Sequence, residues 1–293
     1  MDNLPNIAEL PRIQSDNPGL KIVLSVGGWG AGGFSDMAKT EQGRRVFAES
    51  CARAAERYRL DGIDIDWEYP CIDWAEIDAD PADKETFTLL LQALRDALGN
   101  ERIVSIAAGA GTYFCENTQM DQVARICDYV MLMTYDIRSG FCGEAGHHAC
   151  VYTASGDQYD GSADSTVRDF ACHGVPKERM ILGAAFYARR WEGVPNQNRG
   201  LHQPAKTMGL SGPHYGELKE KYLHGSAFVR HYDERAMAPW LFDGSTFISY
   251  DDPESLKAKC EYAKRENLLG IFYWEHGCDP TRELLTTLAE GLR

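Results

Sequence analysis

Short runs of strand-forming residues alternate with helix-like segments along most of the 293-residue chain. This alternation predicts a parallel sheet whose strands are joined by crossover helices. Apolar residues recur at the helical spacing in residues 82–98, and also in residues 41–58 and 279–292. We predict six strands: Lys21–Val26, Gly62–Trp67, Arg102–Ala108, Tyr129–Thr134, Met180–Phe186 and Leu269–Trp274.

The second predicted strand carries three carboxylates at alternate positions, Asp64, Asp66 and Glu68. Because strand side chains alternate between faces, the acids should share one face, spaced about 6.6 Å apart. The positions between them are bulky and apolar: Ile63, Ile65 and Trp67. Ionising all of several carboxyl groups that crowd a cleft costs free energy, because their negative charges repel. At least one of them should therefore have a raised pKa and act as a general acid. The alternatives are a solvated strand face or a site for a hard cation.

Residues that could take part in catalysis or ligand binding follow the carboxyl ends of the predicted strands. Active sites form at that end of a (β/α)8 barrel, and open doubly wound sheets also bind ligands there. However, no glycine-rich turn follows a strand in the way that dinucleotide binding needs. The glycine-rich residues 27–33 also lack the Lys-Ser/Thr ending of a phosphate loop. We therefore predict an α/β fold of the TIM (β/α)8-barrel type.

Composition narrows the class of protein. A net charge of −14 argues against nucleic-acid binding, which needs a basic face. No apolar stretch approaches the roughly 18 residues of a membrane-spanning helix, and no secretory leader opens this chain. The nine cysteines have neither metal-site nor disulfide-scaffold spacing. Reduced thiols in a cytoplasmic protein are the simplest expectation, although a leader upstream of this sequence would change it, so localisation stays open.

The acidic run also matches a family signature. Residues 61–68 resemble the Asp-Gly-x-Asp-x-Asp-x-Glu pattern of glycoside hydrolase family 18, the chitinases and endo-β-N-acetylglucosaminidases. Further matching motifs follow the family's order over nearly the whole chain: Ser25–Trp29, Met133–Asp136, Phe186–Arg189, Ile248–Asp252 and Gly270–Trp274. By this resemblance Lys21–Val26 is the third barrel strand. The chain would then hold about six of the eight strands.

The resemblance and the pattern together predict a domain organisation. The barrel would consist of residues 1–189 and 248–293, and the first twenty residues are mostly helix-like, with a degenerate strand as the alternative. Residues 190–247 are rich in aromatic residues and too long for an ordinary loop, so they predict an inserted small α+β subdomain. The alternative there is a long loop. Self-association or a second chain would cover the open edges of an incomplete barrel.

The resemblance assigns the catalytic roles. Glu68 would be the general acid and then the base, while Asp66 would turn toward the acetamido N–H of the substrate and Asp64 would tune the electrostatics. The family has no carboxylate nucleophile, because the acetamido oxygen of the sugar attacks its own anomeric carbon. Tyr135 would donate a hydrogen bond to the acetyl group, and Asp136 would orient it. For Asp61, a capping or folding role is as plausible as a catalytic one.

The same resemblance suggests residues that bind the sugar. Trp274 would form the aromatic floor under the reacting sugar, because sugars present apolar C–H faces. Tyr187 would hydrogen-bond that sugar, and Met133 completes the motif that contains Tyr135. Weaker candidates are Trp29, for which rim packing is an equal alternative, and Arg189, which would reach a neighbouring subsite or pair with an acid. Ser25, Gly27 and Gly28 would shape the barrel beside the acids.

No metal or organic cofactor is expected. Residues 142–150 contain two Cys and two His, but their spacing matches no recognised zinc pattern, so we prefer a groove-lining loop. The sequence thus predicts hydrolysis of β-1,4-linked N-acetylglucosamine polymers or oligomers, such as chitin. The alternatives are cleavage of N-glycan or peptidoglycan-type glycans, a non-catalytic sugar-binding lectin, and an inactive fragment. Retention of Glu68 argues against the lectin.

Overall fold

The computed structural model describes residues 7–224 and 227–293. Residues 1–6, the start of the predicted helix-like lead, and residues 225–226, within the predicted insertion, lie outside this range. The chain divides into two compact units. Unit 1 comprises Met1–Ala108 with Tyr113–Val130, and unit 2 comprises Gly109–Thr112 with Met131–Arg293.

All six predicted strands form in the described residues, with ends shifted by one or two positions. They are β1 (Val23–Gly27), β2 (Gly62–Asp66), β3 (Ile103–Gly109), β4 (Tyr129–Met133), β5 (Met180–Ala185) and β11 (Gly270–Trp274). Their order in the sheet is β1-β2-β3-β4-β5-β11. Parallel strands joined by helices, with a separate second sheet, confirm the predicted TIM-barrel class with six of its eight strands.

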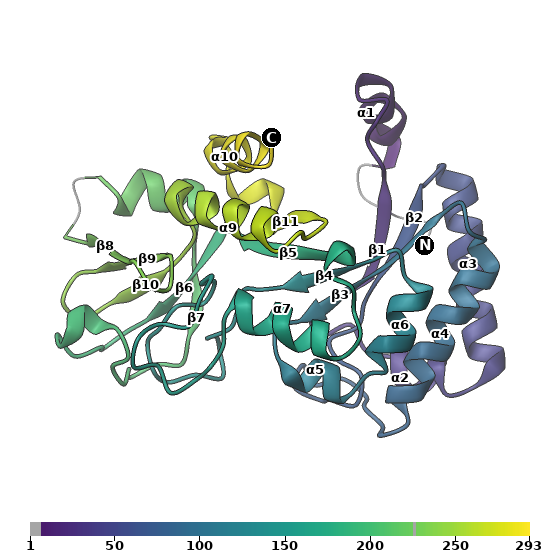
Figure 1. Cartoon of the computed structure of the whole chain (residues 1–293), viewed down its shortest axis with the longest axis horizontal. Helices are drawn as coiled ribbons and strands as arrows, with labels where there is room; N and C mark the ends of the chain where they lie inside the picture. The colour runs from purple at the N-terminus through teal and green to yellow at the C-terminus, as the bar shows by residue number, and fades with distance from the viewer. Residues whose placement is uncertain (1–6, 225–226) are drawn as a thin grey trace. The chain divides into compact units, whose positions relative to one another are not determined.

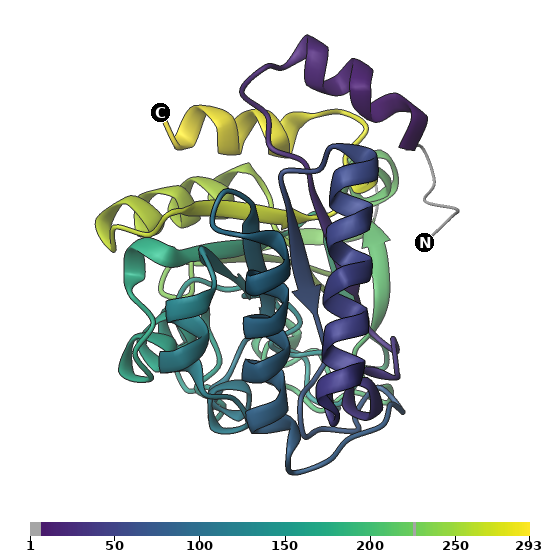
Figure 2. The same cartoon turned by 90° about the vertical axis from the view of Figure 1, so that its right-hand side faces the viewer.

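Unit 1 packs helices against the apolar side of its strands. Its helical segments are η1 (Ile7–Glu9), α1 (Leu10–Asp16), α2 (Phe34–Ala38), α3 (Glu41–Tyr58), α4 (Asp83–Leu98) and α6 (Met120–Ile126), while α5 (Thr112–Glu116) begins at the last residue of the short unit-2 segment. Figures 1 and 2 show α3 and α4 running side by side. Trp67, 1% exposed, stacks on Phe34 of α2 and meets Phe87 of α4 edge-on. The apolar face predicted for the acidic strand is therefore buried under two helices.

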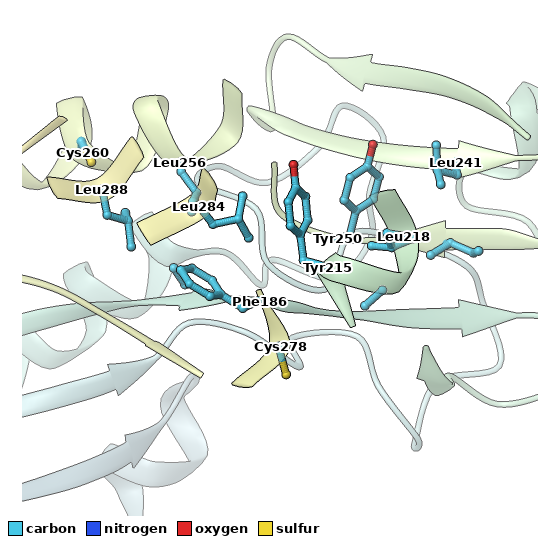
Figure 3. Packing of buried hydrophobic residues seen from close by; sticks show 13 residues of the cluster. Phe186, Tyr215, Leu218, Leu241, Tyr250, Leu256, Cys260, Cys278, Leu284 and Leu288 are labelled. Atoms are coloured by element: carbon cyan, nitrogen blue, oxygen red, sulfur yellow. The ribbon is translucent and has the colours of Figure 1, made fainter. Parts of the chain in front are cut away.

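Unit 2 carries the other large core. Its helical segments are α7 (Ala163–Cys172), η2 (Lys177–Arg179), η3 (Asn198–Gly200), α8 (Tyr215–Glu217), η4 (Leu218–Tyr222), α9 (Pro253–Arg265), η5 (His276–Cys278) and α10 (Glu283–Gly291). Helix α9 begins at Pro253, because the Asp252 side chain accepts the N–H groups of Glu254 and Ser255 and because proline fits the first turn of a helix. Figure 3 shows Phe186 packed among side chains of α9 and α10, including Leu256 and Leu284.

A second sheet lies within unit 2, in the stretch where the sequence predicts an α+β insertion. It consists of β6 (Tyr187–Trp191), β7 (Leu210–His214), β8 (Val229–Asp233), β9 (Ala238–Phe242) and β10 (Phe247–Ser249), in the order β7-β6-β10-β9-β8. Every pairing in it is antiparallel. The sheet starts slightly before residue 190 and ends slightly after residue 247, so the domain boundaries themselves stay predictions.

Two further properties concern the described residues as a whole. None of their helices is both long and apolar enough to cross a membrane. No disulfide joins any of the nine cysteines, all of which lie in the described residues, and six of them are buried.

Candidate active site

Asp64 sits at the centre of a hydrogen-bonded layer across three strands of unit 1. The sheet register places Ser25 of β1 and Ser105 of β3 beside it. Both hydroxyls donate to its carboxylate at 2.7 Å, one to each oxygen. Burial raises the pKa of Asp64, and the two hydrogen bonds act in the opposite direction. Asp64 is 2% exposed, so it supports the other acids from within the protein.

Asp66, one step closer to the strand end, holds a proton near neutral pH. Its burial, the neighbouring charges of Glu68 and then Asp64, and a hydrogen bond with Glu68 together raise the pKa of Asp66 to about 8. Its Oδ1 atom is buried and has no hydrogen-bond partner among the described residues. Two carboxyl groups that share one proton behave as a pair, so the proton belongs to Asp66 and Glu68 jointly.

The backbone beside Asp66 admits only glycine at residue 27. Gly27 has φ of +129°, and a Cβ there would lie 1.9 Å from the Asp66 carbonyl oxygen. The same carbonyl accepts the N–H of Gly28 at 2.7 Å. The glycines of the Ser25–Trp29 motif therefore allow β1 to approach the acid strand closely where β2 ends.

Glu68 follows the end of β2 and contacts the side chain of the next residue. The hydroxyl of Tyr69 hydrogen-bonds with Glu68 and with Tyr113. Burial is the largest cause that raises the pKa of Tyr69 well above its usual value, and the neighbouring Tyr113 and Glu68 add to it. Tyr69 thus remains a neutral phenol that can donate a hydrogen bond beside Glu68 at any ordinary pH.

In unit 2, Arg189 of β6 binds Asp136 in a two-point ion pair. Its Nε donates to Oδ1 at 2.6 Å and its Nη2 donates to Oδ2 at 2.7 Å. The fully buried His148 places Nδ1 3.6 Å from the same Oδ1. Burial opposes ionisation of Asp136, but the hydrogen bonds from Arg189 and the nearby His148 ring outweigh burial and hold the pKa of Asp136 well below its usual range. Burial lowers the pKa of His148, which favours its neutral form.

Aromatic side chains gather around this ion pair. Tyr135, two residues beyond β4, meets the rings of Tyr187 at 6.0 Å and Phe272 at 5.9 Å, both edge-on. The ring of Tyr187 also lies 5.4 Å from that of His148. Tyr135, Asp136, Tyr187 and Arg189 therefore form a cluster within unit 2. Within unit 1, Asp64, Asp66 and Glu68 form a cluster of their own.

The remaining predicted binding residues differ in exposure. Trp274 ends β11 and is 56% exposed, and Trp29 in unit 1 is 55% exposed, so both offer an aromatic face to a ligand. Met133 is buried at the end of β4. The peptide bonds Glu68–Tyr69 and Trp274–Glu275 are both cis.

The structure decides several open alternatives. Asp61 accepts hydrogen bonds from the backbone N–H of Ile22 at 2.8 Å and from the Lys21 ammonium at 2.9 Å. These contacts join the start of β1 to the start of β2, which fits a role of Asp61 in folding. Arg189 pairs with an acid. In residues 142–150, His147 lies 3.4 Å from Asp233. The segment is thus tied into unit 2 by its histidines.

Sequence reasoning missed three residues in or beside these clusters, Ser105, Tyr113 and Trp74, and it placed His148 only in a groove-lining loop. Ser105 is a lone hydroxyl residue in an otherwise apolar strand, which is a detectable signal. Trp74 is a large aromatic in an acidic loop shortly after Glu68, and it is 47% exposed. Tyr113 gives no such signal, because only its tertiary neighbours distinguish it from an ordinary aromatic residue.

An acid strand ending in a proton-sharing carboxyl pair, on a barrel-type parallel sheet, is the arrangement of a glycosidase-type protein. The family model "Glycosyl hydrolases family 18" matches residues 2–279. This chain therefore belongs to glycoside hydrolase family 18, as the motifs predicted.

Individual relatives agree with this family. The chain is 32% identical over 311 residues to Chitinase A1 of Niallia circulans, covering 98% of this chain but 44% of that protein. Among solved structures, an N-acetylglucosaminidase of the family from Paenibacillus barengoltzii is 50% identical with a TM-score of 0.97, covering 99% of this chain and 87% of that one. A chitinase-like agglutinin from Robinia pseudoacacia is 26% identical with a TM-score of 0.84, covering 98% and 85%. The chain thus spans less than half the length of Chitinase A1.

Proposed function

We propose that this protein hydrolyses β-1,4-linked N-acetylglucosaminides, such as chitin or its oligosaccharides, with retention and with the help of the substrate's own acetamido group. The observation that carries the proposal is the Asp66–Glu68 pair, in which a pKa of about 8 at Asp66 keeps one proton at the end of the acid strand. A general acid needs such a proton at neutral pH. Membership of the family supplies the substrate class.

In the first step, Glu68 gives its proton to the glycosidic oxygen as the bond to the anomeric carbon breaks. The acetamido oxygen attacks that carbon, which forms a cyclic oxazolinium ion and releases the leaving sugar as an alcohol. When the shared proton is on Glu68, Asp66 is the carboxylate of the pair, and its buried Oδ1, which lacks a partner among the described residues, accepts the acetamido N–H and stabilises the positive charge. In the second step, Glu68 takes a proton from water as the water oxygen attacks the anomeric carbon. The bond between that carbon and the acetamido oxygen breaks, which opens the oxazolinium ring and restores the acetamide.

The unit 2 cluster has the chemistry to hold an acetamido sugar. The hydroxyl of Tyr135 donates to the acetyl oxygen and keeps it near the anomeric carbon. Asp136 accepts a hydrogen bond from the sugar or its acetamide. The two-point ion pair with Arg189 keeps the Asp136 carboxylate ionised and fixes its orientation. The exposed ring of Trp274 packs on the apolar face of the reacting sugar.

Glu68→Gln tests the proposal on the full chain. With a fluorogenic di-N-acetylchitobioside, the variant should lose about 10²–10⁴-fold in kcat, because the general acid and base is gone while the shape is kept. Its affinity for tri-N-acetylchitotriose should stay within about threefold. Glu76→Gln, a change at an exposed acid of the following loop, is the matched control and should keep the wild-type rate. Near wild-type turnover by Glu68→Gln would contradict the mechanism.

A sugar-binding protein without hydrolytic activity is the second candidate, because a chitinase-like agglutinin shares this fold. The same assay separates the two. A wild-type chain that binds chitotriose but releases no product supports the lectin, and a chain that neither binds nor cleaves contradicts both functions.

A further inference from the structure

His148 is a fully buried histidine whose two ring nitrogens have no hydrogen-bond partner among the described residues. An unpaired polar group in the interior of a protein costs free energy. The function proposed above gives this ring no role. The fold nevertheless holds the ring at a defined place, with Nδ1 3.6 Å from Oδ1 of Asp136.

The backbone of His148 is fixed on both sides. Its N–H donates to Oγ of Ser249 at 2.9 Å, and its carbonyl oxygen accepts the N–H of Ile137 at 3.1 Å. Ile137 directly follows Asp136, and Ser249 of β10 is the register partner of Arg189 on β6. A single residue is therefore tied to the chain neighbours of both members of the Asp136–Arg189 ion pair.

The imidazole ring of His148 also packs on a residue of the candidate site. Its centroid lies 5.4 Å from that of the Tyr187 ring, with an interplanar angle of 60°. The hydroxyl of Tyr187 hydrogen-bonds with Asp136. His148 thus contacts the ring of Tyr187 and faces the carboxylate that the same tyrosine binds, so its position bears on both groups.

The charges around His148 favour a neutral ring. Asp136, Arg189 and Asp251 act on it, and the buried ammonium of Lys259 pairs with Asp251. Two carboxylates and two cations balance each other, and burial lowers the pKa of His148. A neutral imidazole has a single N–H, and a neighbouring acceptor decides which nitrogen carries it. The carboxylate that faces Nδ1 favours a hydrogen on Nδ1.

We propose that His148 is a positioning residue, whose neutral imidazole carries its hydrogen on Nδ1 and directs it at Oδ1 of Asp136. Its effect on catalysis rests on the function proposed above. The 3.6 Å separation exceeds an ordinary hydrogen bond by about 0.6 Å, so a small movement of the carboxylate or the ring closes it. Arg189 binds both oxygens of this carboxylate, and His148 adds a donor from a different segment. Asp136 then keeps its orientation when donors of a sugar compete for it.

Nitrogen-15 NMR tests the tautomer without any turnover. The full chain is measured at about pH 8, above the usual pKa of histidine. His148→Asn removes the signals of His148 and so assigns them among those of the eight histidines. We expect a neutral ring with its hydrogen on Nδ1. A charged ring, or a neutral ring with its hydrogen on Nε2, would overturn the proposal.

Steady-state kinetics on the fluorogenic chitobioside tests the positioning role. His148→Leu removes the donor and should lower kcat/KM about 10-fold, while its melting temperature stays within about 4 °C of wild type, because no paired nitrogen is lost. His148→Asn places a side-chain N–H near the position of Nδ1 and should restore kcat/KM to within about threefold of wild type. His147→Leu removes the neighbouring buried histidine, which faces Asp233, and should leave kcat/KM as in wild type. An unchanged kcat/KM in His148→Leu overturns the role.

A double-mutant cycle shows whether His148 acts through Asp136. In an Asp136→Asn background, His148→Leu should lower kcat/KM by less than about twofold, because the carboxylate that it positions is gone. A loss of the full 10-fold or so in that background would contradict the proposal, since His148 would then act independently of Asp136. If the wild type cleaves nothing, the hydrolase proposal fails, and the tautomer found by NMR alone decides for or against the contact of His148 with Asp136.

Discussion

Arg189 donates to both carboxylate oxygens of Asp136, at 2.6 and 2.7 Å, although 53 positions separate the two residues in the chain. The pair joins the loop after β4 to the first strand of the antiparallel sheet, so it couples the family motif at residues 133–136 to the one at residues 186–189. Asp136 has φ of +54°, a conformation that Asp tolerates better than most residues. The fork holds the carboxylate of this residue in one orientation.

Arg189→Lys should raise KM and lower kcat/KM about 10-fold, because an ammonium keeps the charge but cannot form the two-point fork. Steady-state kinetics on the fluorogenic chitobioside measures the effect. Arg230→Lys is the matched control, since Arg230 also binds a carboxylate through two nitrogens, at the N-cap residue Asp252. That change should lower the melting temperature and leave KM as in wild type. Equal kinetics for the two variants would contradict a role for Arg189 in holding Asp136.

Asp66→Asn should flatten the dependence of stability on pH. The folded state raises the pKa of Asp66 from 3.8 to about 8, so the folded protein keeps a proton that the unfolded chain loses. The free energy of unfolding of the wild type should therefore fall as pH rises from about 4 to about 8. Urea unfolding at several pH values should show a smaller fall in the variant. Asp73→Asn, at an exposed position of the same unit, should keep the wild-type slope.

Gly27→Ala should destabilise the protein by more than about 3 kcal/mol or prevent folding, because the new Cβ would overlap the Asp66 carbonyl 1.9 Å away at a φ of +129°. Gly19→Ala is the control, since that position has open space around its Cβ and no positive φ. It should change the free energy of unfolding by less than about 1 kcal/mol in either direction. A stable, active Gly27→Ala variant would show that β1 and β2 do not approach so closely.

Lys259→Met should cost about 3–5 kcal/mol of unfolding free energy, because it leaves the buried carboxylate of Asp251 without its cation. Both side chains are 0% exposed, and Asp251 also accepts Ser255 and the N–H of Ala185 at the end of β5. Adding Asp251→Asn should recover much of the loss, as urea unfolding can measure. Lys221→Met breaks an exposed pair with Glu217 and should cost less than about 1 kcal/mol.

The pattern of residues was enough to predict much of the fold. All six predicted strands form, and each of their ends lies within two residues of its predicted position. The alternation of Asp64, Asp66 and Glu68 with Ile63, Ile65 and Trp67 predicted a buried apolar face and a raised pKa, and both are present. Local periodicity determines which way a strand side chain points, so the sequence by itself settled these features.

Tertiary structure alone decided which partners these residues meet. Ser25 and Ser105 satisfy Asp64 from 39 and 41 positions away, Arg189 selects Asp136, and the loop around Trp74 is fastened to Gly33 and Asp36. No periodicity encodes such pairings, because they depend on strand register and on loop anchors that join distant segments. The sequence thus determined the family, the strands and the acids. The packing of distant segments decided which hydrogen bonds hold the acids in place and which aromatic rings stay exposed.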